Sequence, residues 1–456
     1  IAMNVWKQKK DTASSPAEWV IGADRLMLKN VDFGMTMLPT IDTLGVSIGT
    51  GRVDNTLIDL KNSNISIGNF DCGSGTASYL VPTAEYVAGH PVPADSVPSS
   101  SPPMTVSIKK CHLRLGRALY ATSGAVPKPG FDPSYIEAGD IDLEVSDFFN
   151  RASELRLPIR SLRAKERCGL EVNNASGTLG IDSLGIKIDD FKLATPFSNL
   201  SAQAYLSYAM MAMNPDAPVD MKLDGHLGWQ DLYSFMPSLR DMLRLLPQRS
   251  PVSLDVDASG SVSSLSVKLL KIGIRNFLKL TASGSVDNPT DIKKMNASLD
   301  VDGSLLDARV GNALLASVLK GTGIHVPRFS IKGHIGVRNQ TYMARLAMRS
   351  DAGDTSADGT VSLNAETYDA SVTAKGLNIA TIMPSLGVGV VSGHVTAEGA
   401  GFNPTVPRAH TEISADMATL VYGGHNMAPL KADAALSHGV YNISLEGRNP
   451  NLDLSL

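Results

Sequence analysis

Residues 264–269, Ser-Leu-Ser-Val-Lys-Leu, decide the fold of this chain, because apolar and polar side chains alternate there with a period of two. Residues 278–282 (Leu-Lys-Leu-Thr-Ala) and 297–302 (Ala-Ser-Leu-Asp-Val-Asp) repeat the pattern. Alternate side chains of a strand point to opposite faces, so each run has one apolar and one wet face. This pattern predicts antiparallel or coiled sheet rather than a parallel sheet that is buried on both faces.

The same alternation recurs along most of the chain, and small turn-forming phrases punctuate it. Ser283-Gly284-Ser285, Asp302-Gly303, Asp358-Gly359 and Ser392-Gly393 are such phrases, and we expect them to form turns between short strands. The sequence therefore predicts a mainly β protein, built as a long, curled, repetitive antiparallel-type sheet with a few short helices.

The composition excludes several classes of protein. The chain has 456 residues, a formal charge of -4 and 43% apolar residues. A net negative chain offers no strong positive field to phosphates, so we expect no nucleic-acid partner, and the apolar fraction excludes wholesale disorder. No run approaches the 18 apolar residues of a membrane-spanning helix. Because Ile1 is the first residue, we interpret the chain as part of a longer one, with an anchor or export signal upstream.

Few segments have apolar residues at the spacing of a helix. Those that do predict helices near 238–246 and 305–320 and a third, short helix over 147–155. The Pro-rich insertion 81–104 and the stretch 123–134 have no periodic apolar face, so we expect surface loops there.

One phrase occurs twice: Asp231–Pro237 (Asp-Leu-Tyr-Ser-Phe-Met-Pro) matches Asn378–Pro384 (Asn-Ile-Ala-Thr-Ile-Met-Pro), and each copy precedes Gly-punctuated strands. A fainter echo begins at Asp147. We therefore divide the chain into four segments: a β-groove segment 1–140 with the Pro-rich insertion, a second groove segment 141–230, a repeat unit 231–377 with the two longer helices, and a truncated second copy 378–456.

Catalytic motifs are weak. Gly45-Val46-Ser47-Ile48-Gly49 matches a nucleophile elbow, but its alternation predicts a strand with an outward Ser47. Cys72, Cys111 and Cys168 lie far apart, which favours core thiols, although one disulfide is possible. We expect no enzyme activity, no metal and no cofactor.

Each strand has one apolar face, and the predicted helices are too few to cover these faces, so the apolar side chains must be buried in another way. Either two sheets close into a sandwich, or the sheet curls so that the apolar side forms a channel for acyl chains. In the channel interpretation, the apolar residues of the strands line a lipid-binding groove. The candidate lining residues are Ile65, Ile67, Leu179, Ile181, Leu265, Val267, Leu269, Leu278, Leu280, Leu299, Val301, Leu346, Met348, Val361, Leu363, Val372, Leu436, Ile443 and Leu445.

Three phrases carry a family resemblance: Leu157–Leu162 (Leu-Pro-Ile-Arg-Ser-Leu), Cys168-Gly169-Leu170 and Leu193–Ser198 (Leu-Ala-Thr-Pro-Phe-Ser). With the repeated phrase, they resemble the strand-rich middle of AsmA-like proteins, most closely the Bacteroidota type of TamB, the translocation and assembly module subunit. The resemblance implies a periplasmic β-groove, tethered to the inner membrane by a segment not included here. It also implies phospholipid as cargo and, through regions outside this fragment, an outer-membrane assembly-type β-barrel as partner.

The expected function is therefore a lipid-conducting or envelope-assembly scaffold between the inner and outer membranes. Two alternatives stay open. A structural or adhesive β-repeat protein would have closed cores, and a carbohydrate-active β-protein would have a polar cleft with facing carboxylates and aromatic side chains.

Overall fold

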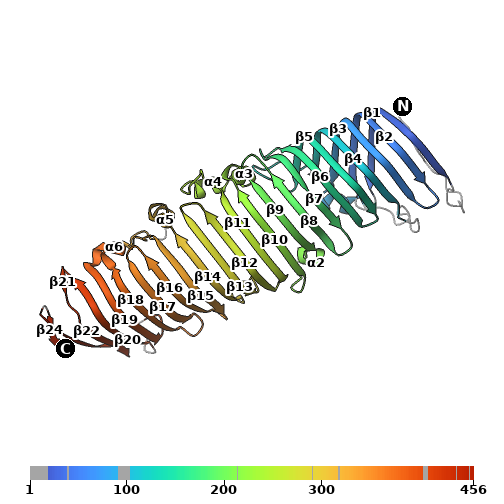
Figure 1. Cartoon of the computed structure of the whole chain (residues 1–456). Coiled ribbons are helices and arrows are strands. Elements are labelled where there is room, and N and C mark those ends of the chain that lie inside the picture. Colours follow the sequence, from blue (N-terminus) through green and yellow to red (C-terminus); the bar gives the residue numbers. More distant parts are fainter. Residues whose placement is uncertain are drawn as a thin grey trace. The chain divides into compact units, whose positions relative to one another are not determined.

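The computed structural model describes residues 19–37, 41–90, 103–212, 214–289, 291–316, 319–403, 409–437, 439–450 and 452–455. The chain divides into two compact units, residues 1–196 and 197–456. Both are mainly β with short helices, which confirms the predicted fold class. Figure 1 shows the strands of each unit lying side by side in chain order.

The first unit is a sheet of long strands. Its ladders join each strand to the next one in the sequence. The elements are β1 (Val20–Met37), β2 (Asp42–Asp59), β3 (Asn64–Val81), α1 (Ala84–Gly89), β4 (Thr105–Thr122), β5 (Tyr135–Arg151), β6 (Glu154–Glu166), β7 (Glu171–Ile181) and β8 (Gly185–Ala194).

One pair in this unit departs from the predicted antiparallel pattern, because β3 and β4 run parallel. Parallel neighbours need a crossover that returns the chain to the same end of the sheet, and residues 82–104 make that connection. The insertion is therefore not only a surface loop: it contains α1, whose first turn is capped by the Thr83 side chain. Residues 91–102 lie outside the described part of the chain.

The second unit is a meander of shorter strands, most of them about ten residues long. Its elements are β9 (Asn199–Ser207), α2 (Tyr208–Met211), β10 (Pro218–Leu227), α3 (Trp229–Phe235), α4 (Leu239–Leu243), β11 (Val252–Ser261), β12 (Ser264–Ile274), β13 (Leu278–Asp287), β14 (Asn296–Leu305), α5 (Ala308–Leu315), β15 (Phe329–Arg338), β16 (Thr341–Ser350), β17 (Gly353–Ser362), β18 (Thr367–Asn378), α6 (Ile379–Ile382), a 3-10 turn (Pro384–Leu386), β19 (Val388–Ala400), β20 (His410–Tyr422), β21 (His425–Asn426), β22 (Leu430–Ser437), β23 (Val440–Asn449) and β24 (Leu452–Ser455).

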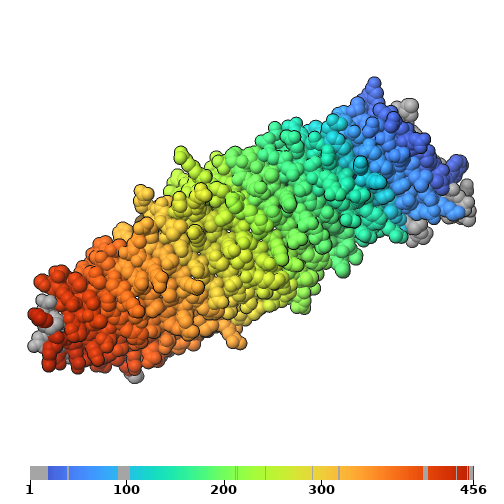
Figure 2. All heavy atoms as spheres, viewed as in Figure 1, coloured from blue at the N-terminus to red at the C-terminus, as the bar shows by residue number. Residues whose placement is uncertain are grey.

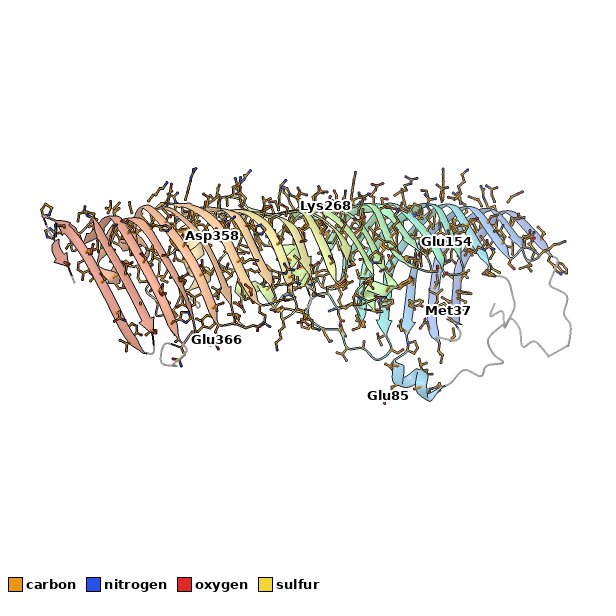
Figure 3. All side chains as sticks on the ribbon, turned by 90° about the horizontal axis from the view of Figure 1, so that it is seen from below. Met37, Glu85, Glu154, Lys268, Asp358 and Glu366 are labelled. Carbon is orange, nitrogen blue, oxygen red and sulfur yellow. The ribbon has the colours of Figure 1, made fainter. Side chains whose placement is uncertain are left out.

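This second sheet is open and curled. Among its described strands, no ladder joins β9 to β24. Figure 3 shows the strands bending along their length, with Lys268 on the outer side of the bend. On β12, Ser266 and Lys268 are exposed, whereas Leu265 and Val267 are half-buried on the other face. The apolar face is therefore the inner face of the curl.

Glycines within the strands permit close approach between neighbouring backbones. Gly284 on β13 and Gly333 on β15 have φ angles of +146° and +156°, and an added Cβ on either would lie 2.0 Å from a carbonyl oxygen of the next strand. Only glycine fits such positions. Gly284, Gly303, Gly359 and Gly393 lie inside strands, so the prediction that their phrases form turns is wrong.

Helices close one edge of the second sheet. Trp229 and Tyr233 of α3 form a buried cluster with strand-end residues Ile274 and Leu305, and with Phe277 of the β12–β13 turn. The indole Nε1 of Trp229 donates to the carbonyl oxygens of Pro247 and Ser250 at 3.2 and 2.8 Å. Side chains of α4 and α5 pack around this cluster, so the two predicted helices exist, although each is shorter than expected.

The third predicted helix, over 147–155, is wrong. Residues of this segment end β5 and begin β6, and the two strands form a hairpin. Asp147 and Ala152 have φ angles of +53° and +51°, which a helix cannot contain. Apolar spacing in so short a segment fits a hairpin as well as a helix.

The repeated phrase marks the same local structure twice. The first copy begins inside α3, and the second begins at the end of β18 and continues through α6. Both helices are followed by a methionine of similar conformation, with φ and ψ of −132° and 82° at Met236 and −142° and 79° at Met383. A proline follows in both cases and a new strand begins beyond it. The echo at Asp147 lies in a hairpin instead.

Candidate functional site

The candidate site is the apolar inner face of the second unit, where four rows of side chains cross the strands from β12 to β23. In the ladders, each member of a row is the direct partner of the next, so all four rows lie on one face. The central row is Val267, Gly284, Leu299, Ile335, Ala344, Gly359, Ala370, Ala397, Ile413, Ala434 and Ile443. None of the rows contains a charged residue.

Most of the predicted lining residues of this unit lie in these rows. The central row includes Val267, Leu299 and Ile443. The second holds Val301, Leu346, Val372 and Leu445; the third, Leu280 and Met348; and the fourth, Leu265, Val361 and Leu436.

Three predicted lining residues lie elsewhere. A β-bulge in β12 places Leu269 in register with Asp257, so Leu270 takes its place on the apolar face. Leu278 packs against the helical cluster at the sheet edge. Leu363 follows the last residue of β17 and is exposed.

The four candidates of the first unit share the apolar face of their own sheet. Ile65 on β3 is the partner of Ile58, and Ile67 is the partner of Thr56. Leu179 lies between Leu157 and Ile188, and Ile181 between Leu155 and Ile186. The four candidates are aliphatic as well, but they belong to a separate unit.

The apolar face of the second unit is not sealed. Ile413 is 40% exposed and Ile443 is 55% exposed. Val301, by contrast, is only 9% exposed, and Leu436 only 6%. A closed sandwich core would bury such residues throughout. The face therefore offers apolar surface to a molecule that lies along the rows.

The outer face is polar and carries ion pairs. Arg345 and Asp358 approach to 2.5 Å, and Lys271 and Asp255 to 3.4 Å. These pairs are exposed, so each contributes little to stability. In the space-filling view of Figure 2, the heavy atoms of each unit form a continuous surface.

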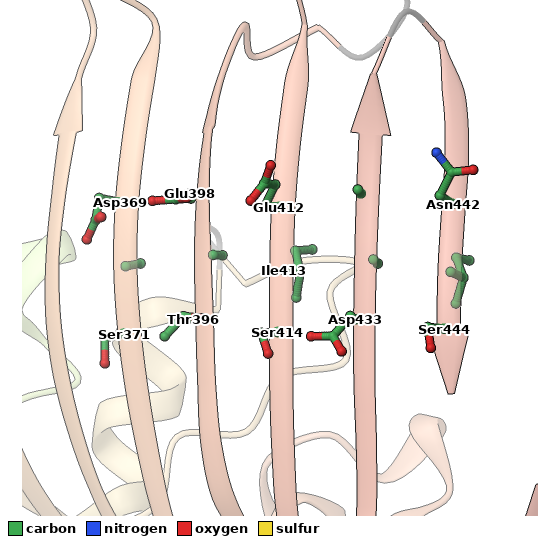
Figure 4. Close-up of a pocket in the computed structure, with 15 residues that line it drawn as sticks. Asp369, Ser371, Thr396, Glu398, Glu412, Ile413, Ser414, Asp433, Asn442 and Ser444 are labelled. Carbon is green, nitrogen blue, oxygen red and sulfur yellow. The ribbon is translucent and has the colours of Figure 1, made fainter. Parts of the chain in front are cut away.

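A hollow of about 580 Å³ lies over β18–β23 (Figure 4). Asp369, Glu398 and Glu412 stand side by side along one of its rows, and Asp433 stands in the next. Its lining contains no aromatic side chain. The carboxylates are neighbours on one sheet surface, so they do not face one another across a cleft as in glycoside hydrolysis.

The cysteines are free thiols. Burial raises the pKa of Cys111 to about 11, and burial together with the nearby Glu166 carboxylate raises the pKa of Cys168 to about 11. Both therefore remain protonated near neutral pH. Among the described residues, no group of three His, Cys, Asp or Glu side chains is placed to hold a metal ion. Within the same residues, no helix combines the length and apolar character needed to cross a bilayer.

The sequence reasoning missed several lining residues. Ile331 and Ile335 on β15 and Leu270 and Ile272 on β12 belong to the rows. The β15 signal was present as Ile-Lys-Gly-His-Ile-Gly-Val, where glycine takes one apolar position. The β12 residues follow the bulge, which shifts the alternation by one residue.

Comparisons with protein-family models, with curated proteins and with solved structures find no match to this chain.

Proposed function

We propose that the second unit binds acyl chains along its apolar inner face and acts as a lipid-conducting scaffold without a catalytic step. The observation that carries the proposal is the set of four uncharged, partly exposed rows that cross the strands from β12 to β23. Such a face suits a flexible hydrocarbon, because it offers contact at many equivalent positions and no polar group that would fix the ligand.

The energetics favour weak, sliding contact. Each methylene removed from water contributes about 0.8 kcal/mol, so a chain that half-buries fourteen methylenes gains roughly 6 kcal/mol. Because successive strands lie about 4.8 Å apart, a chain along a row moves between similar environments with small barriers. The small members of the rows, such as Ala357, Gly359 and Ala370, leave space for the chain.

Site-specific photo-crosslinking tests the proposal directly. A photoreactive residue at Leu346, on the apolar face of β16, should crosslink to a radiolabelled phospholipid. The matched control is Ala347, the next residue on the same strand, which is exposed on the polar face. Equal labelling at both positions, or no labelling at Leu346, contradicts the proposal.

The resemblance to AsmA-like proteins extends the proposal to a setting. The scaffold would lie in the periplasm, tethered to the inner membrane, and would reach an outer-membrane assembly-type β-barrel through regions outside this fragment. Mass spectrometry of organic extracts from the purified chain would identify the bound lipid class.

A further inference from the structure

One hollow on the outer face differs in charge from the others. Its volume is about 770 Å³, and its basic lining residues are His226, Arg249, Lys271, Arg275 and Lys279, with no acidic residue. Aliphatic residues whose side chains belong to the apolar face, among them Ile272 and Leu280, also line it. The chain as a whole carries a formal charge of -4. The charge of this hollow is therefore positive, opposite to the net charge of the chain.

Other hollows contain their own counter-charges or are acidic. The hollow around His334 also holds Arg345 and Asp358, which form an ion pair. In the hollow that Lys165 lines, this lysine approaches Asp140 at 3.6 Å.

In the basic hollow, Lys271 pairs with Asp255 at 3.4 Å, but Asp255 does not line it. Arg249, Arg275 and Lys279 form no ion pair with any described residue. The neutralising charge must therefore come from solvent or from a ligand.

The strands shape the floor of the hollow. His226, Ser253, Gly273 and Lys279 are successive partners across β10–β13, so they form one row of the polar face. No long side chain rises from the middle of this row. Gly273 has no side chain, and the Ser253 hydroxyl stays close to the sheet because it donates to the Gly273 carbonyl oxygen at 3.1 Å.

Basic side chains surround this low centre. His226 and Lys279 stand at the two ends of the row, about 14 Å apart along the sheet. Arg249 extends from the loop before β11 and Arg275 from the β12–β13 turn. The guanidinium groups can each donate two parallel hydrogen bonds to an oxyanion.

We propose that this basic hollow binds a phosphate group. The oxyanion would lie over Gly273 and accept hydrogen bonds from Arg249, Arg275 and Lys279. A free phosphate and the phosphate of a lipid headgroup share this chemistry. The inference does not depend on acyl chains binding to the opposite face.

The test uses the whole chain and two double variants. Arg275→Glu with Lys279→Glu reverses two charges of the hollow. Lys332→Glu with Arg349→Glu is the matched control, because both residues are exposed bases on the same face, and Arg349 lies in the same row as Lys279. Inorganic phosphate is titrated by calorimetry, and flotation measures binding to phosphatidylcholine vesicles with and without phosphatidic acid.

We expect the hollow variant to lose at least tenfold in affinity for phosphate, for the phosphatidic acid vesicles, or for both, while the control binds like the unmodified chain. Loss for vesicles alone identifies a lipid headgroup as the source, and loss for phosphate alone identifies a soluble ligand. Equal loss in the control, or no binding to either probe, overturns the proposal. If the charge reversals prevent folding, Arg249→Ala with Arg275→Ala must still lower binding several-fold.

Discussion

Replacing Leu280 by Asp separates an open apolar face from a sealed core. Leu280 is the third residue of β13 and lies opposite Ile272 and Gly303. An added Cβ on Gly303 would lie 3.5 Å from Cδ1 of Leu280, so the leucine side chain leans over the glycine. The substitution therefore places a carboxylate directly on the third row.

The expected loss of stability follows from the half-buried state of Leu280. Full burial of a leucine is worth about 1.5–3 kcal/mol, so removing a half-buried one costs about 0.8–1.5 kcal/mol. The new carboxylate faces the open side and keeps much of its hydration. A carboxylate without a partner in a sealed core would cost several kcal/mol more.

Urea unfolding and uptake of a fluorescent phospholipid measure the two effects. We expect the Leu280→Asp variant to fold with a modest loss of stability and to take up much less lipid. Ser285→Asp adds the same charge at an exposed position on the opposite face of the same strand and should leave uptake unchanged. An unfolded Leu280→Asp variant, or one with normal uptake, would refute the reasoning.

Three further predictions concern the stability and reactivity of the chain. Gly284→Ala should destabilise the second unit by about 2 kcal/mol in urea unfolding, because φ of Gly284 is +146° and the new Cβ would lie 2.0 Å from a backbone oxygen. Gly180→Ala is the control and should be nearly neutral, because the atom nearest to its new Cβ lies 3.7 Å away. Hydrogen bonds from Ser134 and Lys128 lower the pKa of Asp132 to about 2. The stability that this carboxylate contributes is therefore present above its ordinary pKa and is lost as the pH falls from about 4 to 2. In the Asp132→Asn variant, the free energy of unfolding should depend less on pH over this range. Cys111 and Cys168, each with a pKa of about 11, should react slowly with a disulfide reagent at pH 8 and rapidly after denaturation, and fast reaction of the folded chain would contradict the raised pKa values.

Period-two alternation predicted the fold and much of the apolar face, because a strand side chain's direction depends only on its position in the run. It could not place Leu269, since the bulge depends on how β12 pairs with its neighbours. It also could not tell glycines in turns from those inside strands. Gly284 and Gly333 serve close backbone approach, which depends on the adjacent strand.

The parallel pairing of β3 with β4 and the basic hollow could not be predicted from the sequence, for a different reason. Both depend on which strands become neighbours. Arg275 and Lys279 are close in the sequence, but the fold adds Arg249 from the loop before β11 and His226 from β10 to the same hollow. The acidic overall composition argued against a nucleic-acid partner for the chain, but it gave no information about this local grouping.

The meander of the second unit has a consequence for how the chain assembles. Every ladder there joins strands that are near neighbours in the sequence. Most hairpins therefore order only a short loop when they close, whereas the β10–β11 and β14–β15 connections also fold α3, α4 and α5. Growth can proceed strand by strand from any nucleus. Removing one complete hairpin would shorten the sheet while keeping the direction and facing of all remaining strands, so its length is free to change in steps of two strands.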